Sequence, residues 1–220
     1  KLWFFAVVVL ALSLALNAFL KNYIPYSAII VLIIAIPLGL IKIYKPNFYV
    51  HNLTELLIYP GISAVFVPIL NIWTIIILLI LISIYDIWAV WHSGIMQKMA
   101  KFQINELKIL GGFFIPYMSK AIRAKIKKFK LSKSKLKNKK IKISLAILGG
   151  GDIVFPIITA GVFMRAFNII PALFVIFGAT LALTYLLFTS EKRKFYPAMP
   201  YITTGIFLGL LLWFLFFILI

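Results

Sequence analysis

The sequence contains no cysteine and very few residues that could bind a metal. The absence of cysteine excludes disulfides, thiol chemistry and thiolate metal sites. The two histidines, His51 and His92, lie far apart and lack the spacing of a ligand pair, so a zinc site is not expected. Acidic residues are also scarce, since five Asp and Glu accompany 23 Lys and Arg. Any carboxylate chemistry in this chain therefore falls on a very small set of side chains.

Long hydrophobic runs are abundant instead. The chain is 64% hydrophobic and 13% charged, with a mean hydropathy of +1.08, whereas a soluble domain is about half apolar and about a quarter charged. The composition indicates an integral membrane protein. Seven stretches approach the roughly 20 apolar residues that a membrane-spanning helix requires, at about 2–20, 25–43, 53–70, 71–91, 142–164, 170–188 and 197–219. We predict an all-α fold, a polytopic bundle of seven transmembrane helices.

The distribution of basic residues orients this bundle. The segment Lys98–Lys142 holds 15 of the 23 Lys and Arg residues, and in an alternating topology its side of the membrane collects six more, against only Lys21 and Arg165 on the other. The positive-inside rule places the basic side in the cytoplasm and the C-terminus outside the cell membrane. The chain thus divides into N-terminal helices (1–97), a basic cytoplasmic loop (98–141) and C-terminal helices (142–220).

The basic loop includes the run KAIRAKIKKFKLSKSKLKNKKIK, which raises the question of nucleic-acid binding. Such binding is not expected, because no aromatic stacking platform is interleaved with the charges. Basic residues beside a membrane attract anionic lipid heads, each contributing about 1 kcal/mol near such a surface. We interpret the loop as a determinant of topology that contacts anionic lipids.

Two aspartates lie inside apolar stretches, Asp86 in NIWTIIILLILISIYDIWAVW and Asp152 in ISLAILGGGDIVFPIITAGVF. Ionisable residues at membrane depth usually mark functional sites. The other three, Glu55, Glu106 and Glu191, fall near segment ends or in polar stretches and need no such explanation. The helical rise places Asp86 about 9 Å, and Asp152 about 15 Å, from the cytoplasmic ends of consecutive antiparallel helices. The two carboxylates can therefore face each other.

Two facing carboxylates in a low-dielectric site cannot both ionise cheaply, so they share a proton. One is then prepared to act as a general base on water and the other as a general acid toward a peptide carbonyl. The alternative is a proton or cation pathway, in which such carboxylates are also found. The two aspartates alone favour proteolysis and transport about equally.

The residues around the aspartates shift this balance. Three glycines, Gly149, Gly150 and Gly151, precede Asp152. Within a helix each costs about 1 kcal/mol relative to alanine, so their presence needs a reason. A small-residue packing face is one reason, and a locally loosened helix that admits water beside a buried acid is another.

Together these residues resemble a known family. Tyr85-Asp86 and Gly149-Gly150-Gly151-Asp152 are similar to the YD and GxGD motifs of the presenilin and signal peptide peptidase family of intramembrane aspartyl proteases. The string GGGDIVFP particularly resembles the archaeal presenilin homologues. Family members usually have nine helices, with motifs in the sixth, seventh and ninth. The resemblance implies that this chain corresponds to helices three to nine, with two N-terminal helices absent from the sequence.

The family's third motif, Pro-Ala-Leu, belongs at the cytoplasmic start of the last helix. A literal copy at Pro171-Ala172-Leu173 opens the sixth predicted helix on the external side, where it is far from the aspartates. The stretch Pro197-Ala198-Met199-Pro200 opens the seventh helix on the cytoplasmic side. Met199 replaces leucine there with little change in volume. We therefore assign the motif to Pro197, Ala198 and Met199.

The resemblance implies an intramembrane aspartyl endopeptidase that hydrolyses peptide bonds in transmembrane segments of other membrane proteins and requires no metal or organic cofactor. It implies that Asp86 and Asp152 are catalytic, that Tyr85 and Gly149–Gly151 shape their surroundings, and that Pro197–Met199 engages substrate. A prepilin or preflagellin peptidase is one alternative, although those enzymes lack a Pro-Ala-Leu element. A cation channel or transporter that uses the aspartates is another, and an inactive scaffold a third.

Overall fold

The computed structural model of the chain describes residues 2–44, 47–92, 111–117, 144–190 and 196–219. These residues form a helical bundle with one short two-stranded sheet, and the predicted helical class is confirmed. The elements are α1 (Leu2–Leu20), α2 (Ser27–Tyr44), α3 (Phe48–Phe66), α4 (Ile72–Trp91), β1 (Phe113–Tyr117), β2 (Ser144–Leu148), α7 (Gly151–Ala166), α8 (Ile169–Thr189) and α9 (Ala198–Leu219). Apart from β1 and the two residues before it, the predicted basic loop lies outside the described residues.

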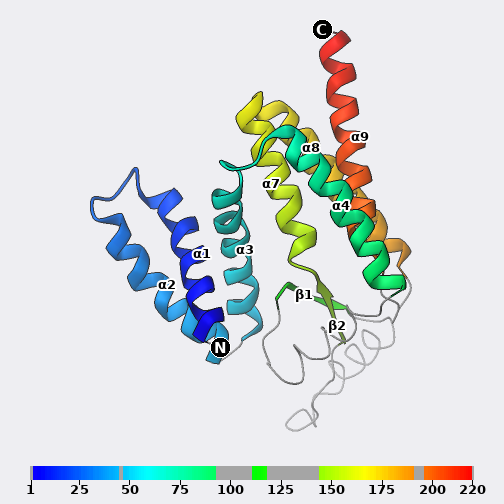
Figure 1. The fold of residues 1–220 in the computed structure, drawn as a ribbon. Helices are drawn as coiled ribbons and strands as arrows, with labels where there is room; N and C mark the ends of the chain where they lie inside the picture. Colours follow the sequence, from blue (N-terminus) through cyan, green and yellow to red (C-terminus); the bar gives the residue numbers. More distant parts are fainter. Residues whose placement is uncertain (1, 45–46, 93–110, 118–143, 191–195, 220) are drawn as a thin grey trace, which may run out of the picture.

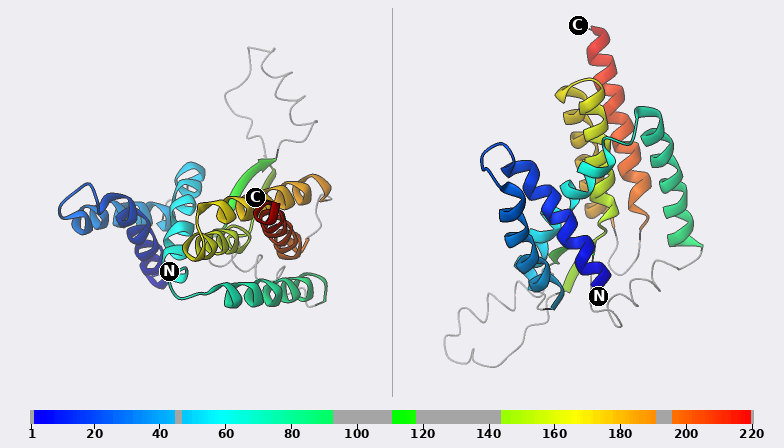
Figure 2. Two further views of the ribbon diagram at one scale, coloured as in Figure 1. Left: turned by 90° about the horizontal axis from the view of Figure 1, so that it is seen from above. Right: turned by 60° about the vertical axis from the view of Figure 1, so that its left-hand side comes forward.

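The helices pack in two groups that meet between α3 and α7. One buried cluster joins α1, α2 and α3 and includes Leu12, Ala35 and Ile58. The other joins α4, α7, α8 and α9 and includes Leu79 and Ile202. Figures 1 and 2 show α3 and α7 in the middle of the bundle, with α1 and α2 on one side and α8 and α9 on the other. Contacts between α3 and α7 therefore couple the N-terminal group to the C-terminal one.

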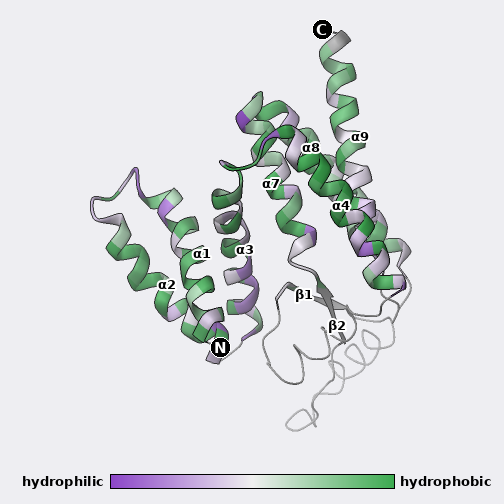
Figure 3. Ribbon diagram, viewed as in Figure 1, coloured by the Kyte–Doolittle hydropathy of each residue, from purple (hydrophilic) through white to green (hydrophobic). Residues whose placement is uncertain are grey.

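Five of the described helices, α1, α2, α4, α8 and α9, are long and apolar enough to cross a membrane. The helix α7 has only 16 residues, and the first half of α3 is polar, as the hydrophilic colouring of that stretch shows in Figure 3. Seven helices are present in the described part of the chain, as expected. That all seven cross the membrane stays a prediction.

The predicted helix 142–164 is wrong at its start. Residues Ser144–Leu148 form β2, which pairs with β1 in an antiparallel register from Phe113↔Leu148 to Tyr117↔Ser144. The helix α7 begins only at Gly151, so Gly149–Gly151 span the junction between strand and helix. Asp152 consequently lies in the first turn of α7, and not about 15 Å into a helix. A short apolar run such as SLAIL does not reveal by periodicity whether it is strand or helix.

Three glycines bring α8 and α9 into close contact. A side chain on Gly178, Gly205 or Gly209 would overlap the backbone of the opposite helix. Small residues allow this approach between membrane helices, where van der Waals packing drives association. The position of α9, which begins with the Ala198-Met199-Pro200 stretch, is therefore set by its contact with α8.

Candidate active site

The three predicted motifs gather at one end of the bundle. Figure 1 shows that the end of α4 and the starts of α7 and α9 lie at the same end of the molecule, beside the β1–β2 sheet. The helix α4 contacts both α7 and α9. Asp86 near the end of α4, Asp152 at the start of α7 and Met199 at the start of α9 are thus brought together from positions far apart in the sequence.

Asp86 is buried, with 7% of its surface exposed, and its carboxylate faces the start of α9. The backbone N–H of Met199 donates a hydrogen bond to its Oδ2 atom at 3.0 Å, and the amide of Ala198 also interacts with this carboxylate. The first amides of a helix lack partners within the helix, and the helix dipole favours a negative charge beside them. Asp86 therefore caps α9 as well as belonging to α4.

Asp152 is partly buried, and space is tight at two of the three glycines before it. The amide of Gly149 donates to its carboxylate, and a Cβ atom on Gly149 would lie 2.9 Å from Oδ2 of Asp152. A Cβ atom on Gly150 would lie 3.2 Å from the ring and hydroxyl of Tyr59. At Gly151 the nearest atom, on Phe155, would be 3.6 Å away, an ordinary contact. An added carbon at 149 or 150 would therefore press on the Asp152 carboxylate or on Tyr59, whereas one at 151 would not be crowded.

The carboxylates of Asp86 and Asp152 interact electrostatically across the gap between α4 and α7. In the described part of the chain neither forms an ion pair with a basic side chain. The same residues contain no group of three or more His, Cys, Asp and Glu side chains that could hold a metal ion. What this arrangement offers chemically is a pair of neighbouring carboxylic groups that can share a proton and polarise a water molecule.

The side chain of Tyr85 and the literal Pro-Ala-Leu sequence do not lie with the two aspartates. Tyr85 is 56% exposed, and its ring packs against Trp88, with ring centroids 6.2 Å apart, on a face of α4 other than that of the buried Asp86. The literal Pro171-Ala172-Leu173 opens α8, at the opposite end of the bundle from the start of α9 (Figure 1). Of the two proline stretches, it is therefore the one at Pro197 that lies beside Asp86.

A hydrogen bond between α4 and α9 was not predicted from the sequence. The buried hydroxyls of Ser83 and Thr203 lie 2.8 Å apart, and Ser83 also bonds the carbonyl of Leu79 at 2.7 Å. Ser83 lies one helical turn before Asp86, and Thr203 one turn after Met199. The pair therefore supports the Asp86–Met199 contact from within the bundle. The signal in the sequence was a single serine one helical turn before Asp86 in a largely apolar helix.

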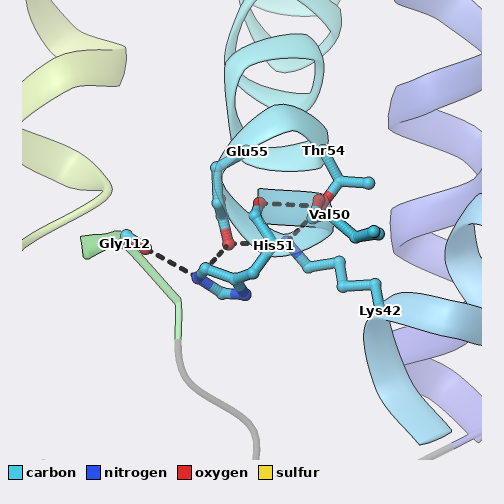
Figure 4. A network of polar contacts seen from close by, with 6 residues as sticks. All are labelled: Lys42, Val50, His51, Thr54, Glu55 and Gly112. Carbon is cyan, nitrogen blue, oxygen red and sulfur yellow. Dashed lines mark hydrogen bonds and ion pairs between the residues drawn. The ribbon is translucent and has the colours of Figure 1, made fainter. Parts of the chain in front are cut away.

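A second unpredicted feature is a buried polar cluster on α2 and α3 (Figure 4). The Nζ atom of Lys42 lies 2.6 Å from Oε1 of Glu55 and 3.4 Å from Oγ1 of Thr54. The Nε2 atom of His51 lies 2.8 Å from the carbonyl oxygen of Gly112 and 3.7 Å from Oε1 of Glu55. The expectation that Glu55 needs no explanation is wrong, because it is only 4% exposed. Opposite charges in consecutive apolar stretches were the signal that could have revealed it.

Comparison with known proteins identifies a family and a similar fold. The family model described as signal-peptide peptidase, presenilin aspartyl protease matches residues 2–219. A solved structure described as a presenilin family intramembrane aspartate protease has a similar fold, with a TM-score of 0.62 and 19% identity, covering 96% of this chain and 72% of the other. No curated protein sequence matches the chain.

Proposed function

Because the chain belongs to the signal-peptide peptidase and presenilin family of intramembrane aspartyl proteases, we propose that it hydrolyses peptide bonds within transmembrane segments of other membrane proteins. The observation that carries this proposal is the approach of Asp86 and Asp152 at one end of the bundle, with the start of α9 bonded to Asp86. The similar fold of a solved family member supports the same architecture.

In the proposed reaction the two aspartates share one proton and act on a single water molecule. The ionised carboxylate takes a proton from water as its oxygen attacks the carbonyl carbon of the substrate. The protonated carboxylic group first donates a hydrogen bond to that carbonyl. A proton then passes to the amide nitrogen as the C–N bond breaks, leaving a new carboxyl and a new amino terminus. Because the pair titrates as a unit, neither role belongs permanently to Asp86 or to Asp152.

A transmembrane substrate must unwind before it can be cut, since a helix hides its carbonyls in its own hydrogen bonds. The unwound segment then needs new partners for its backbone. The strand β2 ends at Leu148, one residue before Gly149, and addition of an extended peptide to a sheet edge is a common mode of recognition. We assign this role to the backbone near β2 and to the Pro197–Met199 stretch, with Asp86 and Asp152 beside them.

The membrane orientation is part of the proposal. The end of the bundle that carries the aspartates is placed at the cytoplasmic side, where the basic residues of segment 98–141 contact anionic lipid heads. The start of α1 lies at this end and the end of α9 at the other (Figure 1), which supports termini on opposite sides. The substrate is then cut in the cytoplasmic half of its transmembrane segment.

The proposal is tested by reconstituting the protein in vesicles with a doubly tagged single-span substrate. We expect cleavage by the wild type at a site that mass spectrometry maps to the transmembrane segment, and none by Asp86→Asn or Asp152→Asn. The same vesicles report cation flux. Flux that depends on both aspartates, without any peptide cleavage, would contradict the proposal and indicate an ion pathway.

A further inference from the structure

The buried polar cluster on α3 reaches the candidate active site through Tyr59. Glu55 and Tyr59 are four residues apart on α3, so their side chains are neighbours on the same face. The ring of Tyr59 is 4% exposed and packs against Phe113, the first residue of β1, with ring centroids 5.6 Å apart. Its hydroxyl lies 3.2 Å from where a Cβ atom on Gly150 would be. One side chain thus contacts both the sheet and the turn that carries Asp152.

The hydroxyl of Tyr59 is not explained by packing. Its oxygen is buried and forms no hydrogen bond of standard geometry within the described part of the chain, although the Glu55 carboxylate lies near it. It interacts electrostatically with Glu55 on one side and with Asp152 on the other. A buried donor without a partner costs free energy that a phenylalanine at the same place would not. The hydroxyl therefore has a role beyond filling the space between α3 and Gly150.

The polar groups beside Tyr59 are themselves fixed by short contacts. Lys42 fixes the carboxylate of Glu55 at 2.6 Å, in a site where both side chains are almost fully buried. His51 bonds the carbonyl of Gly112 at 2.8 Å, which ties α3 to the residue just before β1 (Figure 4). The start of β1 is thus joined to α3 by two contacts, the His51–Gly112 hydrogen bond and the packing of Tyr59 on Phe113.

We propose that Tyr59 is a positioning residue for Asp152, and that its hydroxyl, which lies between the carboxylates of Glu55 and Asp152, sets the orientation and protonation of Asp152. The titratable groups that act on Asp152 are Asp86 on α4 and Tyr59 on α3, with Glu55 behind Tyr59. Tyr59 acts through Asp152 and does not touch the substrate. The consequence for catalysis rests on the proposed function, whereas the effect on Asp152 itself does not.

The first test compares cleavage by Tyr59→Phe with that by the wild type. Phenylalanine keeps the ring that packs on Phe113 and Gly150, so the variant is expected to fold. We expect kcat to fall about tenfold with KM within about twofold, because a contact to a charged group at the reacting centre is lost while substrate binding is kept. The pH profile of kcat is expected to move.

The matched control is Tyr49→Phe, on the same helix but with Tyr49 78% exposed, and it should behave as the wild type.

The second test does not need proteolysis. The carboxyl infrared band of Asp152 is identified by its loss in Asp152→Asn, which is practical because the chain has only five acidic residues. In an Asp86→Asn background, Tyr59→Phe should move the titration midpoint of this band by at least about half a pH unit, a roughly threefold change in proton affinity. The inference is overturned if Tyr59→Phe leaves the titration midpoint of Asp152 unchanged. It is also overturned if this variant has the kcat and pH profile of the wild type. If the wild type cleaves nothing, the proposed function fails, and the midpoint alone decides the role of Tyr59.

Discussion

The backbone N–H of Met199 donates a hydrogen bond to Oδ2 of Asp86, at 3.0 Å, across 113 residues of sequence. This bond joins the last helix of the chain to the helix that carries the first aspartate. It places the Pro197–Met199 stretch beside a residue of the proposed catalytic pair. We therefore expect changes that alter how α9 packs to affect the site.

The Gly149 position predicts a steric effect on catalysis. A Cβ atom there would lie 2.9 Å from Oδ2 of Asp152, so Gly149→Ala should displace the carboxylate and reduce kcat about a hundredfold, as misplacement of a reacting group by about 1 Å can do. Gly151→Ala, whose Cβ atom would meet only Phe155 at 3.6 Å, should cause a much smaller loss. The measured cleavage rates of the two variants test this difference in kcat. Equal losses would show that glycine is required for backbone conformation and not for space.

Because α8 and α9 pack closely, we predict that a larger residue at their contact lowers the stability of the fold. Gly205→Ala would push a methyl group into the backbone of Gly178, and overpacking of this kind costs about 1–3 kcal/mol. The variant should unfold at a lower temperature in detergent and lose activity in parallel. Gly111→Ala is the matched control, because no atom of the described residues lies within 4 Å of the added carbon. A normal unfolding temperature for Gly205→Ala would mean that the two helices can separate at little cost.

The Ser83–Thr203 hydrogen bond predicts coupling between α4 and α9. Ser83→Ala and Thr203→Val each remove the 2.8 Å contact, so a double-mutant cycle on unfolding free energy should give an interaction of about 0.6 kcal/mol, the average for hydrogen bonds between membrane helices. Thr204→Val serves as control, since Thr204 is exposed and bonds only within its own helix, to the carbonyl of Pro200. Additive effects of the two changes would rule out a direct contribution of this bond.

Because Lys42 and Glu55 form a buried pair, we predict that replacing one of them destabilises the fold more than replacing both. Lys42→Met leaves the buried carboxylate of Glu55 without its lysine partner, with only His51 at 3.7 Å, and should destabilise the fold by about 3–5 kcal/mol. Replacing both partners, in Lys42→Met/Glu55→Leu, should recover most of that loss, because neither charge remains buried. Lys21→Met, at an exposed lysine, should have little effect. Denaturant unfolding in detergent measures all three, and a double variant no more stable than Lys42→Met would refute the asymmetry.

The sequence predicted the helices well where an apolar run was long. The stretch 2–20 agrees with α1, and 71–91 agrees with α4 to within one residue. The prediction was wrong for a short apolar segment that pairs with a strand far away in the sequence. Ser144–Leu148 reads as the start of a helix until it is paired with Phe113–Tyr117, on the other side of the basic segment. No local pattern carries that non-local information.

The aspartates and the proline stretch could be predicted because their chemistry is unusual for a membrane helix, whereas their supports could not. Ser83 and Thr203 become partners only when α4 and α9 pack, and Tyr59 reads as an ordinary aromatic residue until Gly150 is seen against it. Glu55 was placed at the polar start of a predicted helix, 53–70. The helix α3 begins five residues earlier, at Phe48, which carries Glu55 into the interior opposite Lys42.

The central claim is that Asp86 and Asp152 act as one catalytic unit. The most direct measurement is the initial rate of cleavage of a reconstituted single-span substrate by the wild type, by Asp86→Asn, by Asp152→Asn and by the double variant. Groups that act as a unit give non-additive losses. We therefore predict that each single variant falls to the uncatalysed background and that the double variant falls no further. Cleavage that persists in either single variant at a rate comparable to the wild type would contradict the account.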